Sequence, residues 1–149
     1  MKSMPKLNEH LCFALYSASR AMTGAYQEYL NALGITYPQF LVLLTLWESD
    51  GERVSAIGER LFLDSATLTP LLKRLEANGF VERRRSTADE RVVEVFLTAT
   101  GKRLEKKAIE MSEGVFCKTN LSLAELTRMR DSLHALTQHL HDVEARKAG

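Results

Sequence analysis

VSAIGERLFLDSATLTPLLKRLEANGFVERRRSTADERVVEVFL, residues 54–97, holds three predicted elements in order: a short helix, a second helix, and a basic hairpin. Ser55 is a typical N-cap residue and is expected to begin the first helix. The apolar side of that helix is expected to hold Ile57, Leu61 and Phe62. Only Leu63-Asp64 separates the two helices, which is the short connection of a helix-turn-helix.

The second helix has two candidate N-caps, Asp64 and Thr67. Its inward face consists of four leucines, Leu68, Leu71, Leu72 and Leu75. Asn78-Gly79 ends it, because Gly readily adopts the left-handed conformation that a helix end needs. The N-cap decides the setting of Pro70. With Thr67 as the cap, Pro70 lies in the first turn and is tolerated, whereas in the helix interior it costs ~3 kcal/mol.

Two strands are expected after this helix, at residues 80–86 and 91–97. The polar turn between them, residues 87–90, lacks Gly and should be longer than a two-residue hairpin turn. The ribbon concentrates four arginines, Arg83, Arg84, Arg85 and Arg91. This layout is that of a winged helix-turn-helix, whose second helix can enter a DNA major groove. The competing interpretation is a protein-binding or purely structural winged helix.

The candidate DNA contacts come from the second helix and the wing. Small or hydrogen-bonding residues near the helix start suit base edges and phosphates, and cations further along suit phosphates. These residues are Ser65, Ala66, Thr67, Thr69, Lys73 and Arg74, with Arg84 and Arg85 on the wing.

Residues 64–101, DSATLTPLLKRLEANGFVERRRSTADERVVEVFLTATG, closely resemble the winged helix of MarR-type bacterial transcription regulators. The DxRxxxxxLT pattern of that family appears as Asp89-Glu90-Arg91 followed by Leu97-Thr98, with Gly101 beyond. The resemblance extends over nearly the whole chain and is closest to the organic hydroperoxide resistance regulators. It implies that Asp89 braces the wing tip and that Arg91 reaches a minor groove. Without that role the two residues form a surface ion pair worth ~0–1 kcal/mol.

Length and composition favour one globular domain spanning residues 1–149. The chain has 149 residues, of which 45% are hydrophobic, and a formal net charge of +1. No apolar run of signal-peptide or membrane-spanning length is present, so a cytoplasmic protein without a membrane partner is expected. Its two cysteines should then be thiols. The sequence indicates no cofactor, and no phosphate-binding glycine loop, metal-ligand cluster or nucleophilic triad argues for an enzyme.

Helical patterns flank the DNA-binding segment, so the expected fold is mainly α with a small β-wing. A long amphipathic helix is predicted at residues 7–33, with Gly34 as its stop. A buried helix is predicted at residues 39–48, with Pro38 in its first turn. Beyond the wing, Thr98 should cap a helix that is interrupted near Gly114 or ends near Asn120.

A capping box, Ser122 with Glu125, should begin the last helix. Its apolar seam is Leu126, Met129, Leu133, Leu136, Leu140 and Val143. One small domain has little room to bury this seam, so the terminal helices, about 7–33 and 98–146, are expected to form a homodimer. The alternative is that they only cover their own domain.

Taken alone, Cys12 is expected to be an inert, small buried hydrophobic residue. A sensing thiol needs donors or positive charge nearby, which Tyr26 and Tyr37 could supply. Neither phenol reaches Cys12 within one helix, because fourteen helical residues span about 21 Å. They could approach it only from a partner subunit.

The family resemblance supplies roles for these residues. In organic hydroperoxide regulators a cysteine in an LCFALY-like segment reacts with peroxide and is hydrogen-bonded by two tyrosines of the other subunit. These positions fall on Cys12, Tyr26 and Tyr37, and Cys117 occupies the place of the second cysteine in the two-cysteine type. The resemblance therefore implies a repressor that an organic hydroperoxide releases from double-stranded operator DNA, through an intersubunit Cys12–Cys117 disulfide. The bland alternative is that Cys117 is a buried spectator.

Three further expectations complete the prediction. Phe13, Met22, Trp47 and Phe116 are candidates for an apolar entrance for an alkyl peroxide, although such a set is more often plain core. The histidines, including His139 and His141, are expected on the surface without a metal, since residues two apart on a helix face different directions. The alternative functions are a MarR-type repressor that responds to a non-covalent small-molecule ligand, and a thiol peroxidase.

Overall fold

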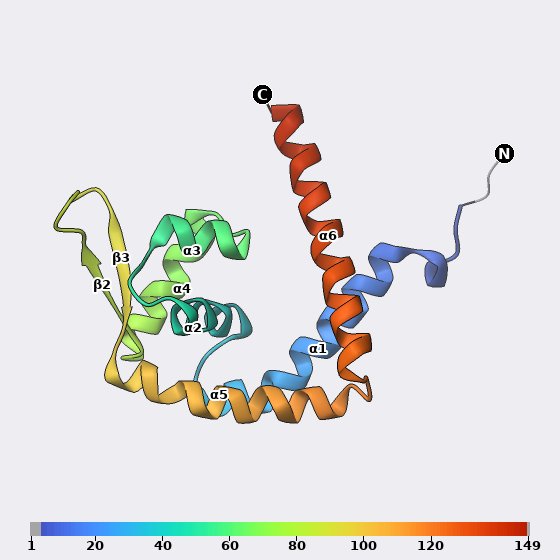
Figure 1. The fold of residues 1–149 in the computed structure, drawn as a ribbon, viewed down its shortest axis with the longest axis horizontal. Helices are drawn as coiled ribbons and strands as arrows, with labels where there is room; N and C mark the ends of the chain where they lie inside the picture. The colour runs from blue at the N-terminus through green and yellow to red at the C-terminus, as the bar shows by residue number, and fades with distance from the viewer. Residues whose placement is uncertain (1–3, 149) are drawn as a thin grey trace. The chain divides into compact units, whose positions relative to one another are not determined.

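The computed structural model describes residues 4–148, which form two compact units. The larger unit ends at Val115 and holds helices α1–α4, a three-stranded sheet and most of α5 (Figure 1). The smaller unit begins at Phe116 and holds the last turn of α5 together with α6. The predicted fold class, mainly helical with a small β-wing, is confirmed.

Helix α1 is Leu11–Leu33, so the predicted start at residue 7 is wrong. A separate 3-10 turn, Leu7–Glu9, precedes it, and His10 between them is extended. The Glu9 carboxylate accepts the Lys6 N–H at 2.9 Å, which closes that short turn on itself. Gly34 ends α1 in the left-handed conformation (φ 67°), as predicted.

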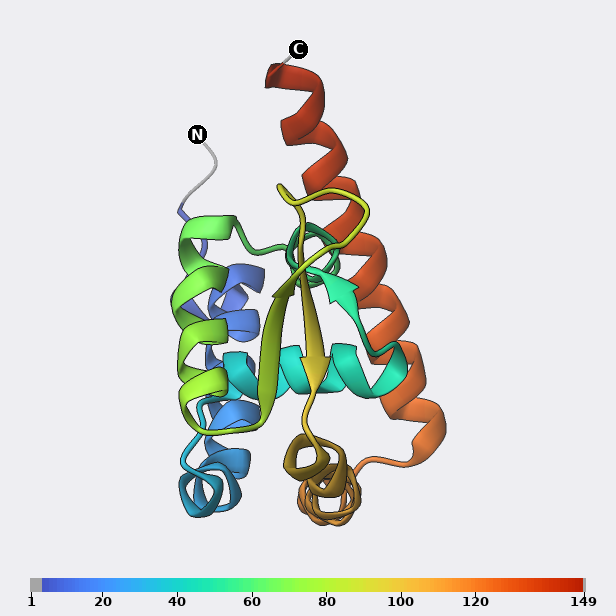
Figure 2. The same ribbon diagram turned by 90° about the vertical axis from the view of Figure 1, so that its left-hand side faces the viewer.

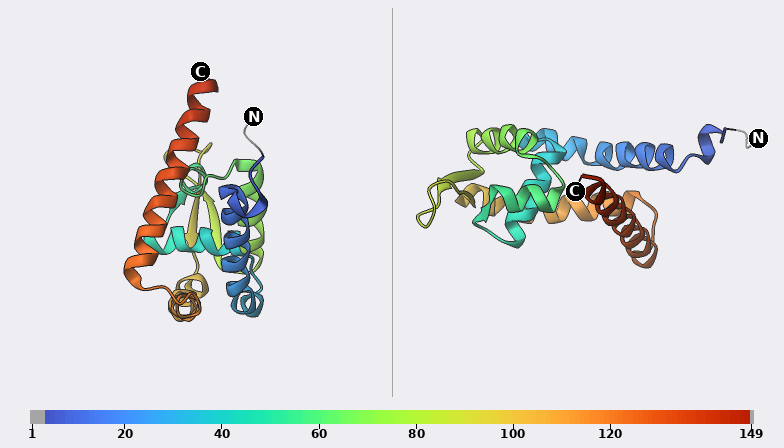
Figure 3. Two further views of the ribbon diagram at one scale, coloured as in Figure 1. Left: turned by 90° about the vertical axis from the view of Figure 1, so that its right-hand side faces the viewer. Right: turned by 90° about the horizontal axis from the view of Figure 1, so that it is seen from above.

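Helix α2, Tyr37–Glu48, begins at a capping box in which the Thr36 N–H donates to Gln39 Oε1 at 2.8 Å. Pro38 lies in its first turn, where its missing N–H costs little. The helix is buried as predicted, with Leu43 and Leu46 fully enclosed. Helices α1 and α2 meet at an 80° bend (Figure 3). Among residues 4–148, no helix by itself has the length and apolar character to cross a membrane, and only this bent pair passes that test together.

Helix α3 is Val54–Leu61 with Arg53 as its N-cap, so Ser55 lies inside the helix and does not cap it. Phe62 ends it in the left-handed conformation (φ 54°) and is 55% exposed, contrary to the predicted inward position. The reversal into α4 needs that conformation at the helix end, which turns the Phe62 side chain outward.

Helix α4, Ser65–Ala77, is capped by Asp64, whose Oδ1 accepts the Thr67 N–H at 2.7 Å. This choice of N-cap places Pro70 in the helix interior, where its ring nitrogen cannot donate to the Ala66 carbonyl. The helix nevertheless packs tightly, because Leu68, Leu72 and Leu75 are each at most 1% exposed.

The sheet has the order β1-β3-β2 and is antiparallel throughout. Strands β2 (Val81–Arg85) and β3 (Val93–Leu97) form the predicted wing. The segment that connects them, residues 86–92, is longer than the predicted turn at residues 87–90. Strand β1, Glu52–Arg53, was not predicted and pairs with the other edge of β3. Val81, Val95 and Leu97 form the buried face of this sheet.

Helix α5, Ala99–Lys118, begins where the Thr98 hydroxyl accepts the Gly101 N–H at 3.0 Å, as predicted. It continues through Gly114 without interruption, so of the two expected endings the one near Asn120 holds. Close packing at its start requires Gly101, because a Cβ there would lie 2.1 Å from the Phe80 carbonyl oxygen. The Trp47 indole N–H donates to the Gly101 carbonyl at 3.0 Å and joins α2 to α5.

Helix α6, Leu123–Ala148, begins at the predicted capping box, with the Ser122 N–H donating to Glu125 Oε2 at 2.9 Å. Its apolar seam is largely uncovered, since Met129 is 54% and Leu140 is 55% exposed. Exposed apolar side chains also follow α1, among them Leu11 and Met22. These faces are the surfaces on which a dimer was predicted.

Asp50 joins the base of the wing to α5. Its Oδ1 accepts the Leu97 N–H at 2.7 Å and the Gly51 N–H at 3.0 Å, and its Oδ2 pairs with Lys102 Nζ at 3.0 Å. Burial raises the pKa of Asp50, but the hydrogen bonds from Leu97 and Lys102 outweigh it, so the pKa is lowered overall.

Asp50→Ala is expected to destabilise the protein by about 1–3 kcal/mol near neutral pH, because it leaves the Leu97 N–H without its acceptor. A depressed folded-state pKa stabilises the protein above the unfolded value, ~4, and that contribution is lost as the pH falls through the folded value. Thermal unfolding at fixed protein concentration should therefore show a gap between wild type and variant that narrows below about pH 4. Asp131→Ala, which breaks an exposed pair with Arg130, is the control with little effect. A gap that widened toward acid would contradict this role.

Candidate nucleic-acid interface and cysteine site

The start of α4 presents the small residues predicted to contact DNA. Ser65, Ala66 and Thr67 are exposed, and Thr69 is half-buried because it turns toward the core side of the helix. Lys73 and Arg74 are exposed further along. Figure 2 shows the start of α4 at the same end of the larger unit as the wing loop. One surface of this unit therefore carries both predicted DNA-binding elements.

The wing arginines differ in what their charges contact. Arg83 forms a two-pronged ion pair with Glu76, at 2.6 and 2.9 Å, which ties β2 to α4. The Arg84 guanidinium pairs with Glu82 at 2.6 Å and lies 4.9 Å from the centre of the Phe96 ring. The basic ribbon is thus partly neutralised within the fold.

Arg85 and Arg91 flank the wing tip. Arg85 donates to the Glu90 carbonyl at 3.1 Å and holds the loop closed. Asp89 Oδ1 accepts the Arg91 backbone N–H at 3.0 Å and its Nε at 3.2 Å. These two hydrogen bonds lower the pKa of Asp89. Since the Arg91 side chain is 91% exposed, Asp89 orients a cation that projects from the wing.

Tyr26 and Tyr37 form one aromatic cluster with Phe40. Their ring centres are 5.4 Å apart, and Phe40 lies 5.7 Å from Tyr26 and 6.1 Å from Tyr37. Burial and the neighbouring Tyr26 raise the pKa of Tyr37, so its phenol stays protonated and can donate a hydrogen bond. The two tyrosines named in the sequence are therefore neighbours in space, brought together by the bend between α1 and α2.

Both cysteines are free, exposed thiols. Cys12 lies in the first turn of α1 in the larger unit, and Cys117 lies in the last turn of α5 in the smaller unit. Cys117 is exposed within one chain, and its role stays a prediction. One helical turn beyond Cys12, Tyr16 accepts a hydrogen bond from Arg20 at 3.2 Å, and the guanidinium lies over its ring.

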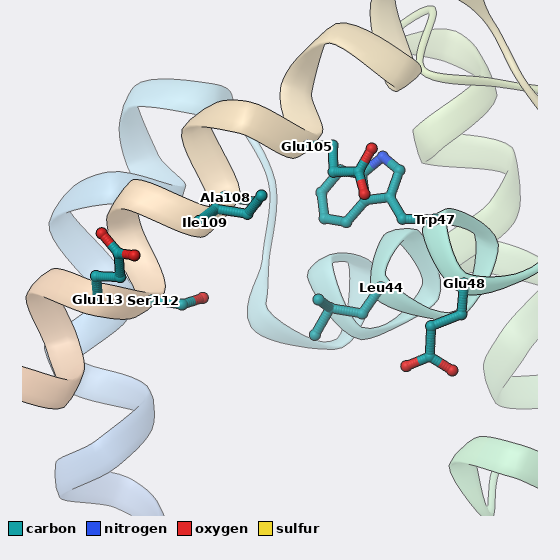
Figure 4. A pocket seen from close by; sticks show the side chains of 8 residues that line it. All are labelled: Leu44, Trp47, Glu48, Glu105, Ala108, Ile109, Ser112 and Glu113. Atoms are coloured by element: carbon teal, nitrogen blue, oxygen red, sulfur yellow. The ribbon is translucent and has the colours of Figure 1, made fainter. Parts of the chain in front are cut away.

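A cavity of about 320 Å³ lies between α2 and α5 in the larger unit. Figure 4 shows Leu44 and Trp47 of α2 facing Ala108 and Ile109 of α5. The other residues that line it are Glu48, Glu105, Ser112 and Glu113. Of the four residues predicted for an apolar entrance, Trp47 lines this cavity, whereas Phe13 and Met22 lie exposed on α1 and Phe116 belongs to the smaller unit. The apolar entrance therefore remains a prediction.

The histidines do not form a cluster with metal-ligand geometry among residues 4–148. His134, His139 and His141 are exposed on α6, and His10 contacts the Pro5 carbonyl at 3.2 Å. Within the part of the chain that the structure describes, no group of three or more His, Cys, Asp or Glu side chains is placed to hold a metal ion.

Sequence patterns missed two functional features of this surface. The Arg83–Glu76 pair joins residues on different elements, and the sequence showed only the concentration of arginines in the ribbon, not this partner. Strand β1 places Arg53 beside the wing, and a two-residue strand carries no alternating pattern that could have predicted it.

Known proteins are similar to this chain over nearly its whole length. A family described as "Transcriptional regulator SarA/Rot" matches residues 25–109. The organic hydroperoxide resistance transcriptional regulator of Bacillus subtilis is 44% identical over 136 residues, which is 91% of this chain and 92% of that protein. The HTH-type transcriptional regulator TtmR of Methylorubrum extorquens is 48% identical over 135 residues, covering 91% of this chain and 69% of that protein.

Solved structures of AbfR share the fold at 36–37% identity, and one of them is described as AbfR of Staphylococcus epidermidis. Reduced AbfR bound to DNA superimposes with a TM-score of 0.77 and covers 92% of this chain and 94% of its own. Overoxidised AbfR bound to DNA gives 0.74, with coverages of 90% and 94%. Disulfide-formed AbfR gives 0.68, with coverages of 90% and 91%.

Proposed function

This chain belongs to the organic hydroperoxide resistance regulators of the MarR family, and on that premise we propose that it is a peroxide-sensing repressor whose sensor is Cys12. It is a DNA-binding transcriptional regulator of the winged-helix type. The finer proposal concerns how peroxide is detected and how DNA is released. The observation that carries it is the Tyr26–Tyr37 pair, set far from the Cys12 of its own chain.

The tyrosine pair serves a second subunit. Cys12 and Tyr26 lie fourteen residues apart on the continuous helix α1, which separates them by about 21 Å within one protomer. A second copy whose α1 runs antiparallel would bring its own Cys12 to these phenols. Both groups are accessible to it, since Cys12 is exposed and Tyr26 and Tyr37 are only half-buried. A phenol that stays protonated donates to a thiolate and favours it over the thiol.

The chemistry proceeds in two steps. The Cys12 thiolate attacks the outer oxygen of an alkyl hydroperoxide, the O–O bond breaks, and an alcohol leaves as Cys12 becomes a sulfenic acid. The thiol of Cys117 of the partner subunit then displaces water from that sulfur and forms a disulfide. Cα atoms must come within about 7 Å for this bond, so the terminal helices adjust as it closes. Because the same helices carry the DNA-binding units, the spacing of the two recognition helices changes and the operator is released.

The mechanism needs a dimer, and the exposed apolar faces of α1 and α6 support one. Leu11, Met129 and Leu140 are each more than half exposed within one chain. Large apolar surfaces of this kind mark sites of association. A homodimer would bury them and would present two α4 helices to half-sites about one duplex turn apart.

Treatment of the reduced protein with one equivalent of an organic hydroperoxide tests the proposal. A disulfide-linked dimer should appear on a non-reducing gel, and operator binding should be lost in the same proportion and restored by dithiothreitol. A fatty-acid hydroperoxide should act at lower concentration than hydrogen peroxide if an apolar entrance exists. Equal potency would remove the reason for that entrance, and release of DNA without any crosslink would argue against the disulfide.

The cavity between α2 and α5 supports a second candidate, a repressor that responds to a non-covalent ligand. Its walls are apolar but its rim holds Glu48, Glu105 and Glu113, which disfavours an anionic ligand. In such a protein the ligand would release DNA under reducing conditions, even when Cys12 is replaced. A thiol peroxidase, by contrast, would consume excess peroxide with turnover, whereas a sensor consumes about one equivalent per thiol.

A further inference from the structure

Arg53 ends strand β1 and lies beside the wing. In the antiparallel sheet it is paired with Glu94 of β3, and Glu94 is paired in turn with Arg84 of β2. Residues directly opposite one another across strands share a sheet face, so Arg53, Glu94 and Arg84 form one row across the three strands. The neighbouring Val95 is fully buried, which puts this row on the face away from the core.

The two arginines of the row differ in how their charge is used. Arg84 is paired with Glu82 and stacked on Phe96. Arg53 is exposed and, among residues 4–148, forms no ion pair. The hydrogen bonds from Arg91 are the main cause of the lowered pKa of Asp89, and the charge of Arg53 contributes to it as well. The wing tip therefore has a second exposed cation close by. Asp89 and the facing Glu94 offset part of its charge, but no carboxylate among residues 4–148 holds it in a direct ion pair.

This cation stands on the side where DNA would lie. Figure 2 shows the end of β1, the start of α4 and the wing loop together at the upper end of the larger unit, with α5 at the lower end. A duplex that meets the start of α4 in its major groove and Arg91 at the wing would pass over this end. Its nearest backbone would then run alongside β1.

We propose that Arg53 binds a phosphate of the DNA backbone beside the wing. This rests on the proposed DNA-binding mode but not on the redox mechanism. Contacts to phosphates fix the position of a protein on the duplex without reading its sequence. Arg53 would thus anchor the wing while Arg91 enters the groove.

The dependence of DNA affinity on salt tests this role. Each neutralised phosphate contributes about 0.9 to the slope of log K against log salt concentration. Arg53→Gln should therefore reduce the slope by about 0.9 per subunit engaged, and it should weaken operator and random duplexes by the same factor. Arg53→Lys should retain the wild-type slope, because a point charge suffices for a phosphate. Arg103→Gln, the same change on α5, should leave the slope unchanged.

An unchanged slope in Arg53→Gln would overturn the proposal, and so would an Arg53→Lys variant as defective as the glutamine variant. A loss confined to the operator would also overturn it, since a phosphate contact does not discriminate sequence. Peroxide release of the DNA that each variant still binds is measured in parallel. If that release is normal while the slope is unchanged, the Arg53 assignment fails and the sensor function stands.

Discussion

Replacing Cys12 with Ser is expected to abolish the peroxide response, so that the operator complex survives an organic hydroperoxide dose that fully dissociates the wild-type complex. A serine hydroxyl is not ionised near neutral pH and is not oxidised by peroxide, so neither the sulfenic acid nor the disulfide can form. The substitution exchanges one small exposed side chain for another, and DNA affinity before treatment should be unchanged. Electrophoretic mobility shift and non-reducing gels, run on the same samples, provide the two measurements.

Cys117→Ser separates oxidation from release. Its Cys12 should still react with peroxide, but without a resolving thiol the product advances to sulfinic and sulfonic acids. Overoxidised AbfR has been solved bound to DNA, whereas its disulfide form is a distinct structure. We therefore expect oxidised Cys117→Ser to stay on the operator, detected by a mass gain of two or three oxygens without crosslinking. Release by Cys12→Ser, or full release by Cys117→Ser, would refute the disulfide mechanism.

The tyrosine pair provides an internal control for the same measurement. Tyr37→Phe removes a hydroxyl from a half-buried ring that packs on Tyr26 and Phe40. The folded dimer and its DNA affinity should be retained, while the rate of Cys12 oxidation falls. An unchanged rate would mean that the partner's phenol does not support the thiolate.

Elements that end at a local signal were predictable from the sequence. The Ser122–Glu125 box and the Gly34 cap involve residues at most four apart, so capping rules placed both helix ends closely. Phe62 shows the limit of such patterns. Its apolar side chain fits a helical stripe, but the reversal into α4 gives it a left-handed backbone and an exposed position.

Features that depend on distant partners were not predictable. Arg83 and Arg91 look alike in the sequence. In the fold Arg83 forms an ion pair with Glu76 of α4, whereas the Arg91 side chain is 91% exposed. Likewise, the reactive setting that we propose for Cys12 depends on a second subunit, and no spacing within one chain encodes such a contact. Family resemblance proposed that role, and the Tyr26–Tyr37 cluster is the part of it that one protomer can display.

Arg91→Ala is expected to weaken operator binding by about a hundredfold or more. The Arg91 side chain is 91% exposed and touches its own protein mainly through Asp89, so its loss should cost little folding stability. Charged hydrogen bonds contribute about 1.5–3 kcal/mol each, and a dimer loses one Arg91 from each wing. Because 1.4 kcal/mol is about tenfold, the paired loss reaches two orders of magnitude or more.

Asp89→Asn separates positioning from contact. The variant keeps the Arg91 charge but replaces the carboxylate that accepts the Arg91 Nε hydrogen bond at 3.2 Å with a neutral amide. Operator affinity should therefore fall by less than in Arg91→Ala. Fluorescence anisotropy with labelled operator measures both variants, and thermal unfolding checks that each is folded. If Arg91→Ala bound as tightly as wild type, the pair would be only a surface ion pair. DNA recognition would then rest on α4 and on phosphate contacts, because a wing that inserts no cation cannot sense the width of a minor groove.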